Sequence, residues 1–137
     1  MKIVPSEFSN SAWDCFLFSK EIAYQNYQQN VDTDNLLFSL IKKDRITIQI
    51  LKENNADIEK IEKRIISSLK AKAKMKTKQV SLYIGDSLQM IFLKANDIRT
   101  KLNDVVISTE HLIYGLTYDE KYGPLILNHK GILDFLD

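Results

Sequence analysis

The feature of this 137-residue chain that most constrains its fold is an internal repeat. Residues 87–127 align with residues 11–51 at a shift of 76 positions and without a gap. Of the 41 aligned positions nine are identical, where average residue usage would give roughly two or three by chance. The identical pairs are Ser11/Ser87, Phe16/Phe92, Leu17/Leu93, Ile22/Ile98, Thr33/Thr109, Leu36/Leu112, Leu40/Leu116, Ile50/Ile126 and Leu51/Leu127. A period this long indicates two copies of one supersecondary unit packed together.

Apolar residues in the first copy recur with helical spacing. Residues 12–23 carry one apolar stripe at intervals of three and four, with Ser9 as the expected N-cap. Thr33 is expected to cap a short apolar helix over residues 36–41, and Ile46, Ile50 and Leu51 predict a third helix. Asp57 is then expected to cap a fourth, so the copy predicts four helices.

The second copy follows the same plan. A long helix is expected over residues 86–102, Thr109 is expected to cap the next one, and Pro124 suits the first turn of a third. Residues 132–136 predict the beginning of a fourth. We therefore expect an all-α fold of about eight helices in two four-helix repeats, within a single domain over residues 1–137. Repeat one covers about 8–70, a basic linker about 71–80, and repeat two about 84–137. The alternative is an α+β domain with a strand at residues 79–84.

Composition excludes several classes of protein. Hydrophobic content of 45% with 27% charged residues is typical of a globular domain, and a net charge of +1 shows no overall preference for anionic partners. The lone Cys15 lies in an apolar run and is expected to be a buried thiol. We find no signal peptide and no apolar run long enough to span a bilayer, so the sequence predicts a cytoplasmic protein without a membrane partner.

Residues 70–78 carry a lysine at every second position. This run has no arginine and no interleaved aromatic residue, which nucleic-acid recognition would favour. A solvated linker is the preferred interpretation. A nucleic-acid patch is the rival one, and it predicts salt-dependent DNA or RNA binding that is lost when these lysines are neutralised.

Known catalytic motifs are missing from the sequence. None of the four glycines begins a phosphate-binding loop, and no serine elbow or zinc motif occurs. His111 and His129 are the only histidines, and they lie apart in sequence. We therefore expect a binding module rather than an enzyme, with no cofactor and no metal.

Two motifs carry a resemblance to a known family. Residues 8–13, Phe-Ser-Asn-Ser-Ala-Trp, resemble the Phe-Thr-x-x-Ala-Trp opening signature of ClpB-type Clp N-terminal domains. Residues 102–112, ending in Ile-Ser-Thr-Glu-His-Leu, are similar to the second-repeat motif of that family, and residues 32–37 are a weaker counterpart. The resemblance covers residues 6 to about 135 and implies two pseudo-twofold-related repeats.

The resemblance also implies a function. It implies the client-binding N-terminal module of a ClpB-like AAA+ disaggregase, which engages unfolded or aggregated protein and passes it to a hexameric ATPase ring. A DnaK-type co-chaperone would then be a further partner. The alternative within the family is a free-standing adaptor or assembly factor for a Clp protease.

Site residues are carried over by motif position. In the family an apolar groove between the repeats contacts the client, and its polar rim would correspond here to Ser9, Asp104 and Glu110. Groove positions would be Lys94, Ile98 and His111, where Lys94 departs from an apolar pattern. Val105 and Val106 also replace a more usual acid or amide followed by an aromatic. Considered alone, Ser9 is explained as an N-cap, Glu110 as a first-turn acid and Ile98 as core.

Overall fold

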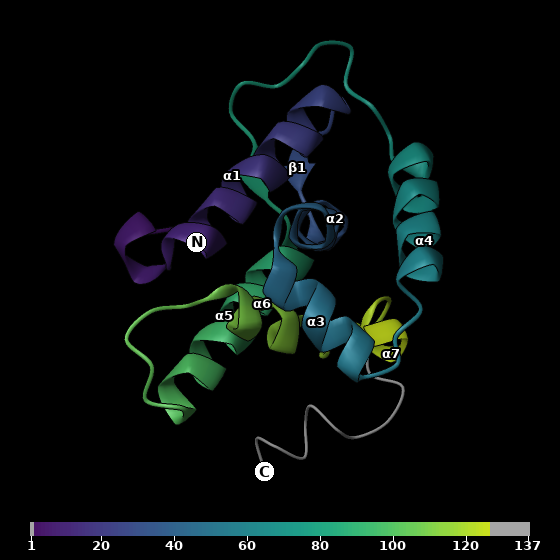
Figure 1. Ribbon diagram of the computed structural model, residues 1–137. Helices are drawn as coiled ribbons and strands as arrows, with labels where there is room; N and C mark the ends of the chain where they lie inside the picture. Colours follow the sequence, from purple (N-terminus) through teal and green to yellow (C-terminus); the bar gives the residue numbers. More distant parts are fainter. Residues whose placement is uncertain (1, 127–137) are drawn as a thin grey trace.

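The computed structural model describes residues 2–126, and its regular structure is almost entirely helical (Figure 1). In chain order the elements are η1, a 3-10 turn (Pro5–Glu7), α1 (Asn10–Gln25), β1 (Asn30–Val31), α2 (Thr33–Lys43), α3 (Arg45–Glu53), α4 (Ile58–Ala71), β2 (Tyr83–Ile84), α5 (Asp86–Lys101), α6 (Thr109–Leu116) and α7 (Gly123–Ile126). The all-α prediction is confirmed, with seven α-helices among the described residues. The predicted helix at residues 132–136 lies outside them.

The repeat in the sequence is also a repeat in the backbone. Helices α1 and α5 each have 16 residues and begin 76 positions apart. Helices α2 and α6 differ in length but also begin 76 positions apart. The turns after the long helices match as well, because Tyr27 and its equivalent Asn103 both have φ 58°. One residue later, the backbone N–H groups of Gln28 and Asp104 each donate to a carbonyl five residues earlier, both at 3.0 Å. The two copies therefore share one conformation through the helix and the turn.

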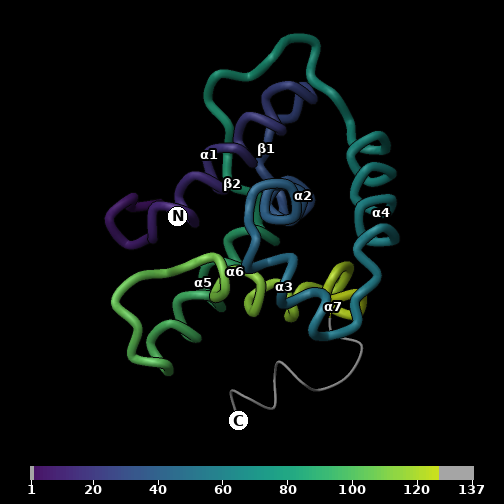
Figure 2. Tube along the Cα trace, in the orientation of Figure 1, coloured from purple at the N-terminus to yellow at the C-terminus, as the bar shows by residue number. Residues whose placement is uncertain are grey.

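Short extended segments cross between the repeats. β1 pairs in parallel with β2, with Val31 opposite Ile84, and Phe8 forms an isolated parallel bridge with Ile107. Phe8 is equivalent to Ile84 and Val31 to Ile107, so the two pairings exchange under the repeat, as a pseudo-twofold axis requires. Figure 2 shows β2 beside β1. The strand considered at residues 79–84 exists only as its last two residues, which is too little to change the fold class.

The core centres on this axis. Phe16 and its equivalent Phe92 contact each other edge to face, with ring centroids 5.5 Å apart and planes at 76°. Equivalent residues can touch only near the axis that relates them. Phe8 and Trp13 extend the cluster, and Phe8 lies 5.8 Å from Phe92 of the other repeat. Aromatic pairs of this kind add about 0.5–1.5 kcal/mol beyond their buried area. The prediction that Phe92 belongs to the core is confirmed, and Trp13 is half-buried and packs against that core.

Helix caps agree with the sequence at two positions and differ at two. Ser9 caps α1 by accepting from the Ala12 N–H at 3.1 Å, and Asp57 caps α4 by accepting from Lys60. The expected caps Thr33 and Thr109 are each wrong by one residue, since Asp32 and Ser108 are the N-caps. Asp32 and Ser108 have extended backbones and form capping boxes with the residue three positions on, so each threonine begins its helix instead.

The segment between α4 and β2 arches over the end of α1 (Figure 1). Its lysines are engaged there: Lys74 Nζ donates to the Asn26 carbonyl, and Lys78 Nζ donates to Gln25 Oε1 at 2.8 Å. Lys78 also lies over the rings of Tyr24 and Tyr27. Contacts with the fold thus account for part of the lysine run.

Candidate functional site

The six residues expected at the site fall into two groups in the structure. Ser9, Asp104, Glu110 and His111 lie around the start of α6, whereas Lys94 and Ile98 lie on α5. The first group is assembled by the crossed pairing of the repeats, because the Ser9 N–H donates to the Ile107 carbonyl at 2.9 Å. Ser9 of repeat one is thereby held beside the first turn of α6 in repeat two. We call the surface of Ser9, Asp104, Val105 and Glu110 the α6 edge.

A histidine organises the α6 edge from beneath. His111 is 1% exposed, and its Nδ1 accepts from the Ser108 backbone N–H at 2.8 Å as the reciprocal half of the capping box. Because a backbone N–H can only donate, the proton of the neutral imidazole stands on Nε2. Nε2 then donates to Asp104 Oδ2 at 2.7 Å. The capping box thus fixes the ring, and the ring fixes the exposed Asp104 carboxylate.

Ser108, His111 and Asp104 form a row that resembles a catalytic triad, with Ser108 Oγ 3.0 Å from His111 Nδ1. A general base needs a free lone pair directed at the serine hydroxyl. Here the Nδ1 lone pair already accepts a backbone N–H, and the Ser108 hydroxyl serves the helix cap. The row is therefore a capping arrangement and not a nucleophile with its base.

Asp104, Glu110 and His111 also have their potential metal-ligand atoms within 4.8 Å of one another. A metal would have to bind His111 through Nε2, and that nitrogen carries the ring proton. Moving the proton to Nδ1 would oppose two N–H groups across the 2.8 Å contact with Ser108. The cluster thus suits a hydrogen-bonded histidine better than a metal ligand.

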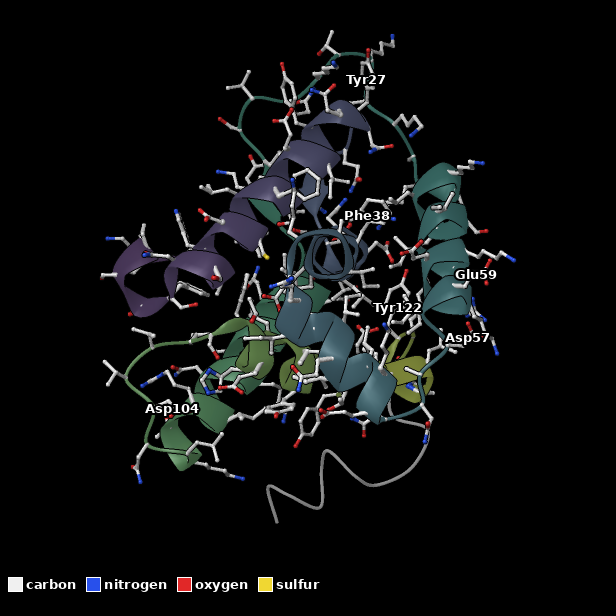
Figure 3. The ribbon with its side chains drawn as sticks, viewed as in Figure 1. Tyr27, Phe38, Asp57, Glu59, Asp104 and Tyr122 are labelled. Atoms are coloured by element: carbon white, nitrogen blue, oxygen red, sulfur yellow. The ribbon has the colours of Figure 1, made fainter. Side chains whose placement is uncertain are left out.

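An exposed apolar side chain lies next to two carboxylates on the α6 edge. Val105 is 91% exposed and directly follows Asp104 in the loop, and a carboxylate oxygen of Asp104 lies within 4.8 Å of one of Glu110. Glu110 itself is half-buried in the first turn of α6. Arg99, near the end of α5, contacts the loop that contains Asp104 by donating to the Asp104 carbonyl at 3.1 Å. Figure 3 shows Asp104 on this outer loop, away from α4. Sequence reasoning missed Arg99, although its position five residues before Asp104, at the end of a long helix, was a usable signal.

Lys94 and Ile98 line a different hollow. They border a cavity of about 310 Å³ along α5 together with Tyr118, whose ring lies 4.8 Å from Lys94 Nζ. Ile98 is only 3% exposed, so it belongs mainly to the core, and His111 is likewise interior. Tyr118 was not expected here because it lies after α6 in the chain and reaches this wall only through the fold.

A hollow of about 690 Å³ between the repeats is lined mostly by charged side chains. The apolar inter-repeat groove that the resemblance implies is therefore not this cavity. At its base lies the carboxylate of Asp34, which is 3% exposed. It accepts from Tyr122 Oη and from Ser68 Oγ at 2.9 Å, and Lys72 Nζ lies 3.0 Å away. We call Asp34 with Ser68, Lys72 and Tyr122 the Asp34 network.

Titration behaviour reflects this packing. Burial by itself would raise the pKa of Asp34, but the hydrogen bonds from Tyr122, Lys72 and Ser68 and the charge of Lys72 outweigh it and hold that pKa below 3.8. Burial and the neighbouring Asp34 carboxylate raise the pKa of Tyr122. Burial mainly, and the charge of Asp44, raise the pKa of Cys15 to about 11. This thiol is buried as expected and stays protonated at neutral pH.

Within residues 2–126, none of the helices combines the length and the apolar character needed to cross a bilayer. Sequence comparison finds ClpB chaperones. The chain is 30% identical over 132 residues to the chaperone protein ClpB of Prochlorococcus marinus and 27% identical over 130 residues to ClpB 2 of Synechocystis sp.. These matches cover 96% and 95% of the chain but only 15% of each relative, so the chain spans a small part of the length of these curated relatives.

Comparison with solved structures supports the fold. The N-terminal domain of Hsp104 from Candida albicans superposes with a TM-score of 0.76 at 15% identity, over 95% of this chain and 81% of that one. In sequence, residues 7–129 match the family model of the Clp repeat (R) N-terminal domain. These residues include both copies of the repeat and the crossed segments that join them, and the chain accordingly belongs to the family of Clp repeat N-terminal domains.

Proposed function

We propose that this domain is the client-binding module of a ClpB-like AAA+ chaperone and that it binds unfolded polypeptide through the α6 edge. The observation that carries the proposal is an exposed valine next to Asp104, whose carboxylate is held by His111 and lies near that of Glu110. An apolar contact with charged neighbours suits an unfolded chain, whose apolar side chains are exposed and whose sequence varies. Affinity should be low, since ordering the client costs much of the contact energy.

The six expected site residues have separate parts in this proposal. Ser9, Asp104 and Glu110 form the polar rim, and His111 positions Asp104 without touching the client. Lys94, backed by Ile98 and joined by Tyr118, forms a second contact area on α5. In a full-length parent, the client would pass from this module to a hexameric ATPase ring, with a DnaK-type system as a partner of the parent. A free-standing adaptor would instead bind a folded subunit of the ring.

An NMR titration with a permanently unfolded casein tests the assignment. We expect chemical-shift changes to gather on the α6 edge. Replacement of Val105 by serine (Val105→Ser) should weaken binding about fivefold, because partial burial of a valine side chain contributes roughly 1 kcal/mol, less than its full burial would.

Val80 provides a matched control, since it is 90% exposed and lies in the linker. Val80→Ser should leave the affinity unchanged. Equal loss in both variants, or shift changes spread evenly over the molecule, would remove the α6 edge from consideration. A folded ring subunit that binds at the same edge while casein does not would favour the adaptor.

A further inference from the structure

A second surface, separate from the α6 edge, lies where α2 turns into α3. A cavity of about 530 Å³ opens there between the last turn of α2 and one face of α3. Figure 1 shows α2 almost end-on, with α3 leading away from it. The floor of the cavity is apolar, formed by Ile41 and Ile48, and its margins are basic. We call it the α2–α3 elbow.

The basic groups of the elbow differ in how far the fold already uses them. Lys42 pairs with Glu62 at 3.3 Å, and Lys43 lies 4.5 Å over the ring of Phe18. Arg45 and Lys52 are exposed and have no hydrogen-bond, ion-pair or ring partner among the described residues. As far as residues 2–126 are concerned, two cations are therefore left for an external partner.

Arg45 is placed against local electrostatics. It occupies the first turn of α3, where the helix dipole disfavours a positive charge. The nearby Asp44 carboxylate forms no ion pair with Arg45 among the described residues; its Oδ2 instead caps α3 by accepting from the N–H and the hydroxyl of Thr47 at 2.7 and 2.8 Å. The fold gains nothing visible from Arg45 at this position, whereas a partner that brings a carboxylate would.

The spacing along α3 defines the geometry of that partner. Arg45, Ile48 and Lys52 stand at intervals of three and four, so a cation, an apolar side chain and a second cation share one helix face. A helix with two carboxylates around an apolar residue at the same spacing would pair with all three groups. A nucleic acid fits less well, since the floor has no aromatic side chain for stacking and two carboxylates, Asp44 and Glu53, also line the cavity.

The described part of repeat two, which ends at residue 126, does not repeat this surface. The residue equivalent to Arg45 is Lys121, and its ammonium is directed inward to Ser68 and to Asp34, at 3.5 Å from Asp34 Oδ1. The residue equivalent to Lys43 is Asp119, which reverses the charge. The free cations of the elbow are therefore a property of repeat one and not of the shared scaffold.

From this charge complementarity we propose that the α2–α3 elbow is a docking site for an acidic amphipathic helix of a partner protein. The site is distinct from the proposed client contact, and the two surfaces have no residue in common. Binding should depend on salt, because its charged contacts are exposed.

The test uses the whole chain and a synthetic helical peptide that repeats Glu-Ala-Ala-Leu-Ala-Ala-Ala. Fluorescence anisotropy should show binding, and a peptide with Gln in place of Glu should bind about three- to tenfold more weakly, as expected when two exposed ion pairs are lost. The double variant Arg45→Glu/Lys52→Glu should lose affinity for the Glu peptide to a similar or greater extent.

The matched control is Lys63→Glu/Arg64→Glu on the exposed face of α4, which changes the charge equally. It should bind the Glu peptide like the unmodified protein. Casein binding should survive the elbow variant, which separates this proposal from the one for the α6 edge. Equal binding of the Glu and Gln peptides, equal losses in both double variants, or tighter binding of a single-stranded oligonucleotide than of the peptide would overturn the proposal.

Discussion

The first turns of α2 and α6 are equivalent in the repeat, yet their acidic residues differ in burial. Asp34 at the start of α2 is buried and receives hydrogen bonds from Tyr122 and Ser68 and an ion pair from Lys72. Its equivalent Glu110 at the start of α6 is half-exposed at the molecular surface. The same backbone position therefore carries a buried, hydrogen-bonded acid in repeat one, whereas the acid of repeat two has no hydrogen bond or ion pair within residues 2–126.

The difference arises from the chain segments that contribute the hydrogen-bond donors. Lys72, which directly follows α4, pairs with Asp34, and Tyr122 donates to Asp34 from the segment before α7. Both bring donors to repeat one. Figure 3 shows Tyr122 in the interior, beside α4 and α7. The two copies thus use equivalent acids differently: Asp34 connects parts of the fold, whereas Glu110 lies on the edge that we propose as the client contact.

The strongest test of this comparison removes each acid in turn. Asp34→Ala should destabilise the protein by about 3–5 kcal/mol, because it leaves the partners of a buried ion pair without their acceptor. Glu110→Ala should change the free energy of unfolding by less than about 0.5 kcal/mol, as usual for a surface change. Urea denaturation measures both values, and similar costs would refute the division of roles.

The contribution of Asp34 should also depend on pH. Since its pKa in the folded protein lies below 3.8, its stabilisation is present at neutral pH and is lost as the pH falls through that lowered pKa. The free energy of unfolding of the Asp34→Ala variant, measured by denaturation at several pH values, should accordingly decrease less at acid pH than that of the unmodified protein.

Tyr122→Phe should have a smaller effect. It removes one donor to Asp34 while Ser68 and Lys72 remain, so we expect a loss of about 1–2 kcal/mol. Because the pKa of Tyr122 is raised above 10.0, its contribution is full below pH 10.0 and is lost as the pH rises further. At alkaline pH the free energy of unfolding should therefore fall less steeply with pH for Tyr122→Phe than for the unmodified protein. Parallel pH profiles of the two proteins would contradict the assignment.

The smallest effect concerns the capping boxes. Asn35 accepts from the Asp32 N–H at 2.8 Å, as His111 does from the Ser108 N–H. His111→Asn places the residue of repeat one in repeat two and should be about 1 kcal/mol more stable than His111→Ala, because it restores an acceptor for that N–H. Thermal unfolding compares the two variants. If their stabilities are equal, the ring of His111 matters for packing rather than for the cap.

Much of the fold could be read from the sequence because its signals are local or periodic. Apolar stripes predicted the positions of α1 and α5. Ser9 and Asp57 predicted where α1 and α4 begin. The threonine caps were misplaced by one residue because Asp32 and Thr33, like Ser108 and Thr109, are both suitable capping residues. Only the reciprocal bonds of Asn35 and His111 select between them.

The candidate site could be anticipated in its members but not in its arrangement. The motif around residues 102–112 pointed to Asp104, Glu110 and His111, which the structure brings together. Their division into exposed rim and buried support depends on the side-chain contacts of His111. Lys94 and Ile98 separate from them because α5 directs these residues to a different wall.

By itself the sequence determined that this protein is a doubled helical unit, since the 76-residue repeat and the apolar periodicity require two similar helix sets to bury their stripes together. Tertiary structure alone decided which copies of equivalent residues are buried. The crossed pairing of Phe8 with Ile107 and of Val31 with Ile84 brings each repeat against the other. The Tyr122 contact with Asp34 spans 88 positions, and no local pattern encodes a contact that depends on how the two copies dock.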